Sequence, residues 1–104
     1  DTTPAPDAES LMRSRYTAFV LERADYLLAT WAAAKRPSQV RFDPGAKWLG
    51  LEVRAFAESD SDHATVEFVA RQREATGRAI RLHERSRFVR ENDRWYYLDG
   101  DIAP

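Results

Sequence analysis

The segment Glu84–Asp99, ERSRFVRENDRWYYLD, decides the fold, because it reads as two strands joined by a two-residue turn. Asn92 and Asp93 occupy that turn, and these are the non-glycine residues that best tolerate the positive φ angles of tight hairpins. The turn pairs position 91 with 94, 88 with 97 and 86 with 99, and directly opposed residues share one face of a sheet. The segment therefore predicts an antiparallel hairpin with Phe88 and Tyr97 on the same face.

Alternation of apolar and polar residues extends this hairpin into a sheet. Period-two patterns run over 48–58, 66–71, 80–88 and 95–98, with turns at 59–62, 76–78 and 92–93. A three-residue loop at 76–78 keeps the apolar faces matched, because it opposes Ala70 to Glu84 and Phe68 to Ser86. We therefore expect a four-stranded antiparallel meander whose second turn has an odd length.

Residues before the sheet have the periodicity of helices. Over 8–21 the apolar side chains fall on one sector at about 100° per residue, and Asp7 is a suitable N-cap. A second helix is expected over 24–34, ended by Arg36 because it precedes Pro37. Two N-terminal helices followed by an antiparallel meander predict an α+β fold, with the helices packed on one face of the sheet.

Composition excludes several classes of function. The 104 residues suit one domain, which we place at 7–104 after a flexible leader at 1–6. The chain has no cysteine, which excludes disulfides and thiol catalysis, and it carries a net charge of −1, so no bulk field favours nucleic acid or a membrane. No apolar stretch approaches the roughly 20 residues of a membrane span, and we expect a cytoplasmic location. With only His63 and His83 and no glycine-rich phosphate loop, we expect neither a metal nor a cofactor.

The predicted register places polar side chains on the apolar face. Glu84, Ser86 and Asp99 share that face with Phe88, and Arg15 lies within the apolar sector of the first helix. An unpaired buried charge costs several kcal/mol, so such groups need partners. We therefore predict that Arg15 pairs with Glu84 or Asp99 across a cavity between helix and sheet.

Two interpretations of this cluster stay open. It is either a structural ion pair that ties helix to sheet, or a small-molecule site in which Arg15 binds an anion and Glu84 or Asp99 acts as a base. The candidate catalytic residues are accordingly Glu84 and Asp99. The residues predicted to line the cavity are Arg15, Tyr16, Glu84, Ser86, Trp95 and Tyr97.

A basic cluster is expected on the opposite face of the sheet. Residues 71–94 contain eight arginines against four acidic residues, a net charge of +4. One interpretation is a solvated face with cross-strand pairs to Glu52, Glu58 and Glu67. The other is a face for RNA, another anionic partner or a second copy of the chain. The arginines proposed for such contacts are Arg71, Arg81, Arg85 and Arg87.

Several separate blocks of the sequence resemble the YchJ family of uncharacterised bacterial proteins. They include Leu11–Tyr16, Trp48–Leu51, Phe68–Arg71, Glu84–Phe88 and Trp95–Gly100, and the resemblance covers about residues 8–100. It implies a nuclear-transport-factor-two-like (cystatin-like) fold, in which helices pack into the concave face of a curved sheet. Many members also carry cysteine-rich SEC-C zinc-binding segments, which this cysteine-free chain does not provide.

The resemblance implies little about activity, so three functions are carried forward. The first is a binding or interaction module, with an unknown small molecule or protein as its partner. The second is an acid/base enzyme of the isomerase, dehydratase or hydrolase kind, and the third is the RNA- or anion-binding sheet face. Analogy with the superfold also suggests a homodimer through the sheet. Whether the chain is an enzyme stays open at this point.

Overall fold

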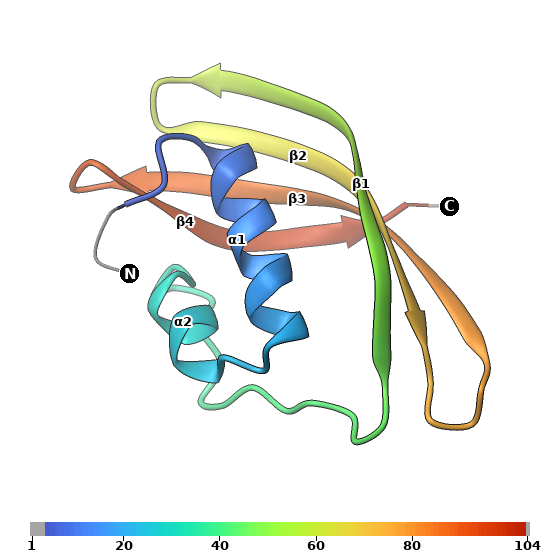
Figure 1. Cartoon of the computed structure of the whole chain (residues 1–104). Helices are drawn as coiled ribbons and strands as arrows, with labels where there is room; N and C mark the ends of the chain where they lie inside the picture. The colour runs from blue at the N-terminus through green and yellow to red at the C-terminus, as the bar shows by residue number, and fades with distance from the viewer. Residues whose placement is uncertain (1–3, 104) are drawn as a thin grey trace.

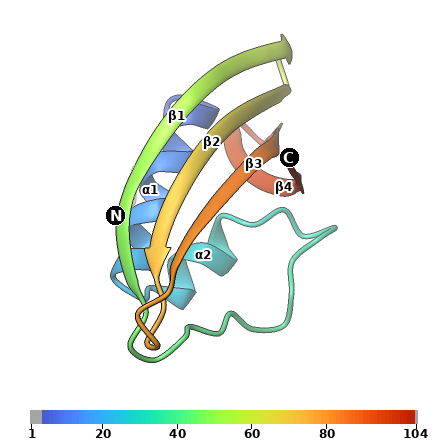
Figure 2. The same ribbon diagram turned by 90° about the vertical axis from the view of Figure 1, so that its right-hand side faces the viewer.

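The computed structural model describes residues 4–103, which form two helices followed by a four-stranded antiparallel meander in the order β1-β2-β3-β4 (Figure 1). The elements are α1 (Ala8–Val20), α2 (Ala24–Ala29), β1 (Lys47–Asp60), β2 (His63–Arg73), β3 (Ala79–Glu91) and β4 (Arg94–Ile102). Both helices lie on the inner side of the curved sheet (Figures 1 and 2). The predicted α+β class and meander are confirmed, and the sheet is open rather than closed into a barrel.

Helix α1 begins at the predicted cap. Asp7 has extended backbone, and its side chain accepts a hydrogen bond of 2.7 Å from the Ser10 amide. Leu11, Met12 and Arg15 are the large side chains that this helix buries. The buried side of α1 therefore carries a cation, which fixes where the site can form. Of the predicted leader, residues 1–3 lie outside the described residues, and Ala5 packs against the core.

Helix α2 is shorter than the sequence predicts, because it ends at Ala29 rather than 34. The chain then pairs with β4: the Ala32 amide donates to the Tyr97 carbonyl at 2.7 Å, and the Tyr97 amide donates to the Thr30 carbonyl at 2.8 Å. These bonds replace the helical ones that residues 30–34 would have made. The early end of α2 places Trp31 beside β4, which matters for the site.

The structure matches the predicted turn between β3 and β4 more closely than the predicted loop between β2 and β3. Asn92 and Asp93 form the expected two-residue turn, with φ angles of 51° and 65°. The β2–β3 loop is odd in length, as predicted, but spans 74–78, so Phe68 pairs with Glu84. Because the pairing differs from the predicted one by two residues, this loop leaves the side chains of β2 and β3 on their predicted faces.

Strand β4 contains an irregularity that overturns one prediction. Phe88 pairs with Tyr97, as expected, but Arg87 pairs with Asp99 and Ser86 with Gly100. The extra residue reverses the face of all later positions in β4. The prediction that Asp99 shares the face of Phe88 is therefore wrong.

Strand β1 also departs from simple alternation. A register shift between Trp48 and Gly50 turns Trp48 toward the core and leaves Leu49 46 % exposed, opposite to the predicted pattern. Gly50 adopts a φ of 150°, which a side chain rarely permits. This shift supplies an aromatic wall of the cavity described below.

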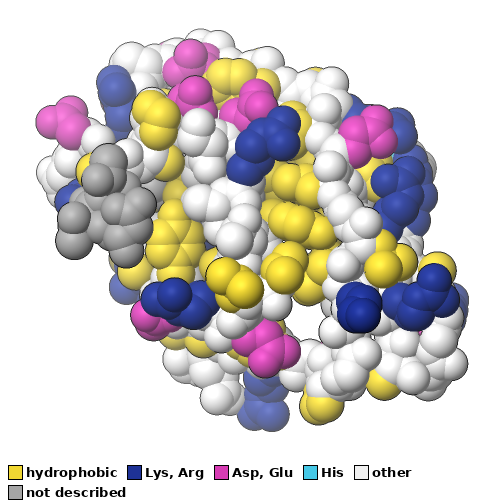
Figure 3. Space-filling view, viewed as in Figure 1, with side chains coloured by type: hydrophobic (Ala, Val, Ile, Leu, Met, Phe, Trp, Pro, Cys, Tyr) yellow, Lys and Arg dark blue, Asp and Glu magenta, His cyan; other side chains and the backbone are white. Residues whose placement is uncertain are grey.

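The core lies between α1 and the concave face of the sheet. Hydrophobic side chains fill the space between α1 and β1, and the surface is hollowed beside the C-terminal end of α1 (Figure 3). Within residues 4–103 no helix is long and apolar enough to cross a membrane. The buried core cluster consists of Ala8, Leu11, Met12, Ala64, Val66, Phe68, Ala70, Phe88 and Trp95.

Candidate functional site

A cavity of about 220 Å³ lies between α1 and the concave face of the sheet. Its walls are mainly apolar side chains from α1 and from three strands, and a few polar groups converge on it. The apolar and aromatic walls come from Met12, Tyr16, Phe19, Trp31, Trp48, Phe68, Ala70, Leu82 and Phe88. The polar groups come from Arg15, Glu84, Ser86 and Tyr97.

The structure brings together all but one of the side chains predicted to line the cavity. Arg15, Tyr16, Glu84, Ser86 and Tyr97 all contribute to its walls. Their roles in binding a ligand stay predictions. The exception is Trp95, which is 6 % exposed and packs toward Leu11 and Ala5 at the other end of the core. Trp95 is therefore structural, and its prediction as a cavity residue is not supported by this geometry.

Asp99 lies on the outer face of the sheet instead of in the cavity. Its carboxylate accepts a bond of 2.6 Å from Arg87 Nε, and Arg87 also contacts Asp101 at 2.7 Å. These two carboxylates raise the pKa of Arg87 above its ordinary value. The register shift in β4 is the cause, and it removes Asp99 both as a base in the cavity and as a partner of Arg15.

Arg15 is held by aromatic rings and by α2 rather than by an acid. Its Cζ lies 4.6 Å from the ring centre of Tyr97 and 5.0 Å from that of Trp31. Nη1 donates to the Leu27 carbonyl at 2.8 Å and to Thr30 Oγ1 at 2.7 Å. Among the described residues Arg15 forms no ion pair, so the predicted pairing with Glu84 or Asp99 is wrong. The carbonyl and hydroxyl at the end of α2 have taken the place of the acid.

Two of the nitrogen atoms of Arg15 are left for other partners. Its Nε and Nη2 have no hydrogen-bond partner in the described part of the chain, although only 5 % of the residue is exposed. Burial lowers the pKa of Arg15 to about 10, so the guanidinium is still charged at neutral pH. The cavity therefore contains a positioned cation with unused donors.

Glu84 is positioned on the sheet side of the same cavity. Its Oε2 accepts bonds from Ser86 Oγ at 2.6 Å and from the Tyr97 hydroxyl at 3.3 Å. Oε1 has no hydrogen-bond partner within residues 4–103. Burial, reinforced by the Glu84 charge, raises the pKa of Tyr97, so its hydroxyl remains a neutral donor. Glu84 thus offers one free acceptor oxygen.

The first residues after α2 complete the site, and sequence reasoning missed their part in it. The ring of Trp31 packs edge-on against Tyr97 with centroids 5.2 Å apart, and its buried Nε1 has no hydrogen-bond partner in the described chain. Thr30 supplies the hydroxyl that accepts from Arg15. The one sequence signal was the β-branched Thr30 in a predicted helix, which disfavours helix continuation.

On the outer face of the sheet, some of the arginines predicted to bind a partner pair with acidic residues of the described chain and others do not. Arg85 lies 3.5 Å from Glu67, one of its predicted cross-strand partners, and His83 Nε2 lies 2.7 Å from the same carboxylate. Arg71 and Arg81 instead oppose each other directly, and neither forms an ion pair within residues 4–103. The described residues contain no group of three side chains that could hold a metal ion. Binding of RNA by this face stays a prediction.

An open, curved antiparallel sheet with helices on its concave face and a lined cavity between them belongs to the nuclear-transport-factor-two-like class of α+β domains. Within that class, residues 7–100 match the family model described as YchJ, middle NTF2-like domain. The chain therefore belongs to the YchJ family, which confirms the resemblance found in the sequence.

Relatives and solved structures agree with this assignment. A UPF0225 protein of Polaromonas naphthalenivorans is 70 % identical over 101 residues, covering 97 % of this chain and 74 % of that protein. A UPF0225 protein of Bordetella pertussis is 64 % identical over 101 residues, covering 94 % of this chain and 74 % of its own length. The solution structure of a SEC-C motif containing protein from Rhodopseudomonas palustris is 34 % identical, with a TM-score of 0.86 over 99 % of this chain and 84 % of that one.

Proposed function

We propose that this domain is a binding module for a small, mainly apolar molecule that carries a carboxylate. The observation that supports the proposal is Arg15, a buried cation that lies against two aromatic rings and whose Nε and Nη2 have no hydrogen-bond partner among the described residues. A buried charge is costly unless its hydrogen bonds are made. A ligand carboxylate would meet that need inside the cavity.

The walls of the cavity define the body of the ligand. Side chains such as Met12, Phe68 and Leu82 give it an apolar lining, which favours a hydrocarbon or aromatic body. Its volume of about 220 Å³ is below the roughly 300–1,000 Å³ of sites for drug-sized ligands. The part of the ligand inside this cavity is therefore about the size of one ring with a short side chain.

The polar groups define the functional groups of the ligand. A guanidinium binds a carboxylate through two parallel N–H groups, and Arg15 has both Nε and Nη2 free for this. On the other side, Glu84 Oε1 would accept from a hydroxyl or amino group of the ligand.

Titration with two matched probes tests the proposal. We expect phenylacetate to bind at least about tenfold more tightly than 2-phenylethanol, which has the same ring but no carboxylate. Ala70→Leu, which adds three carbon atoms to the wall of the cavity, should abolish phenylacetate binding, whereas Ala57→Leu on the exposed part of β1 should not. Amide chemical shifts of the labelled protein measure both affinity and folding. Equal affinities for the two probes, or full binding by a folded Ala70→Leu variant, would contradict the proposal.

Acid/base catalysis is a second candidate, favoured by one observation. Glu84 lies in an apolar cavity that Arg15 also lines, forms no ion pair among residues 4–103, and has an Oε1 without a hydrogen-bond partner there. A carboxylate so placed could remove a proton next to a carbonyl while Arg15 stabilises the developing negative charge.

Hydrogen exchange tests this candidate without knowledge of the natural substrate. Phenylpyruvate carries a carboxylate for Arg15 and exchangeable protons next to its ketone. If Glu84 is a base, the protein accelerates exchange of those protons in D₂O by more than about tenfold, and Glu84→Gln removes the acceleration while phenylacetate still binds. Proton NMR follows the exchange. Exchange no faster than in buffer would leave binding as the function.

A further inference from the structure

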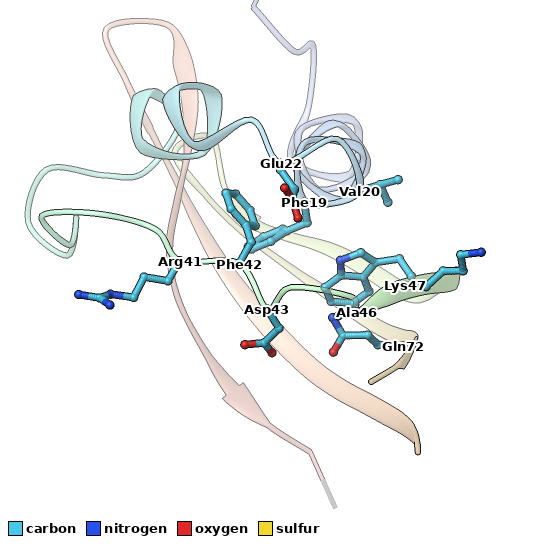
Figure 4. A pocket seen from close by; sticks show the side chains of 10 residues that line it. Phe19, Val20, Glu22, Arg41, Phe42, Asp43, Ala46, Lys47 and Gln72 are labelled. Atoms are coloured by element: carbon cyan, nitrogen blue, oxygen red, sulfur yellow. The ribbon is translucent and has the colours of Figure 1, made fainter. Parts of the chain in front are cut away.

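A second space of about 430 Å³ lies at the C-terminal end of α1, between that helix and the segment that leads into β1 (Figure 4). We call it the outer groove. Phe19, Phe42 and Trp48 give it aromatic walls, and Gln72 adds an amide. Phe19 contacts Phe42 edge-on, with centroids 6.3 Å apart. The outer groove therefore combines aromatic surface with a charged rim, to which Glu22, Arg41, Asp43 and Lys47 contribute.

The outer groove and the Arg15 cavity share a wall. Phe19 and Trp48 line both spaces, and their ring centroids lie 6.0 Å apart. At this wall the two spaces are separated by two side chains, one from α1 and one from β1, and not by backbone. A connection between the two spaces would therefore require only a change of rotamer at Phe19 or Trp48.

Charge distinguishes the two spaces. The Arg15 cavity contains a buried guanidinium and the carboxylate of Glu84. In the outer groove, the side chains of Arg41 and Lys47 point away from the aromatic rings, whereas Phe19 and Phe42 lie side by side (Figure 4). Glu22 and Asp43 add carboxylates to the lining, which would repel the carboxylate of a ligand. The groove thus offers aromatic contact without a cation directed into it, which suits an uncharged ring and not the anionic end of the ligand.

Resting on the proposed function, we infer that the ligand is elongated: its carboxylate binds Arg15, its chain passes Phe19 and Trp48, and an apolar ring occupies the outer groove. The natural ligand class is then an aryl-substituted aliphatic carboxylate or a molecule of the same shape. The cavity alone is too small for such a molecule, and the adjoining groove supplies the missing volume.

A series of ω-phenylalkanoates, from phenylacetate to 8-phenyloctanoate, tests the inference. We expect affinity to rise by at least about tenfold at the chain length at which the phenyl ring passes Phe19 and Trp48, because the alkyl chain then fills the cavity while the ring buries further apolar surface in the outer groove. Amide shifts at Phe42 and Gln72 should begin at that same length. Phe42→Ala should remove the gain for the longer probes and leave phenylacetate affinity within about twofold.

Leu49→Ala is the matched control, since Leu49 is apolar and exposed but lines neither space. It should keep the full gain with chain length. Two failures are distinguishable. If phenylacetate binds but longer probes gain nothing, or gain equally in Phe42→Ala, the elongated ligand is wrong and the binding module stands. If phenylacetate itself does not bind, the proposed function falls and this inference with it.

Discussion

Replacing Arg15 with alanine should lower the free energy of unfolding by about 3 kcal/mol. The substitution removes two charge-assisted hydrogen bonds, to the Leu27 carbonyl and to Thr30 Oγ1. It also removes the contacts of the guanidinium with the rings of Trp31 and Tyr97. The Leu27 carbonyl then keeps only the long 3.4 Å bond from the Thr30 hydroxyl, and a poorly satisfied buried carbonyl adds about 1–3 kcal/mol to the cost. Relief of the desolvated charge offsets part of this loss, so we do not expect the full sum.

Two further variants separate the contributions of charge and shape. Arg15→Lys keeps the charge but loses the planar group that lies over Trp31 and Tyr97, so we expect a loss of about 2 kcal/mol. Arg15→Met keeps much of the volume without a charge, and its loss should be smaller than that of Arg15→Ala. If the hydrogen bonds to α2 stabilise the fold, Arg15→Met is still less stable than the wild type, because the Leu27 carbonyl loses its Arg15 donor in this variant as it does in Arg15→Ala.

Urea unfolding followed by circular dichroism measures these differences, provided that the slope with denaturant is unchanged. For a domain of this size, 3 kcal/mol corresponds to a fall in Tm of more than about 10 °C. Arg13→Ala is the control, since Arg13 is an exposed residue of the same helix that pairs with Glu9 at 3.0 Å. Its effect should be below about 0.5 kcal/mol. An Arg15→Ala variant as stable as Arg13→Ala would show that Arg15 contributes nothing to stability.

The parts of the fold that were predictable from sequence are those with local causes. The turn at Asn92 and Asp93 follows from the conformational tolerance of those residues, and the strands follow from alternation over many positions. The burial of Arg15 was also visible, because its position on α1 depends only on helical periodicity. The loop at 74–78 is two residues longer than predicted, and the side chains of β2 and β3 still lie on their predicted faces.

The parts that were not predictable depend on contacts between distant segments. The shift in β4 that moved Asp99 to the outer face leaves no mark in the alternation of a stretch as short as Trp95–Leu98. The partner of Arg15 was misassigned because α2 ends at Ala29, and that end is set by hydrogen bonds to Tyr97 in β4. The sequence predicted an acidic partner for Arg15, whereas the structure provides a carbonyl, a hydroxyl and two aromatic rings. A charged side chain can be identified from a sequence, but a backbone carbonyl that is free to accept a hydrogen bond cannot.

Gly100 is the position where a single added carbon should disturb the site most. A Cβ at Gly100 would collide with Oε2 of Glu84, would lie 2.9 Å from its Cδ and 3.1 Å from the Arg85 carbonyl. The backbone of Gly100 does not have a positive φ, so alanine would be tolerated there apart from these contacts. The absence of a side chain at Gly100 is therefore what gives the Glu84 carboxylate its place.

We expect Gly100→Ala to lower the free energy of unfolding by about 2–3 kcal/mol, because the inserted group displaces Glu84 from Ser86 and Tyr97. In the background of Glu84→Ala, which removes the colliding carboxylate, the same substitution should cost at least about 1 kcal/mol less. Some loss remains, since the Arg85 carbonyl is still close. Urea unfolding of the four proteins of this cycle gives the coupling energy.

The exposed carboxylate of Glu58, at the far end of β1, provides the matched cycle. Gly100→Ala and Glu58→Ala share no contacts, so their effects should add within about 0.5 kcal/mol. If the effect of Gly100→Ala on the free energy of unfolding simply adds to that of Glu84→Ala, as it should to that of Glu58→Ala, then Gly100 acts through the strand backbone alone. Coupling confined to the Glu84 cycle, together with weaker binding of probes that carry a hydroxyl group, would mean that Gly100 sets the position of the Glu84 carboxylate in the cavity.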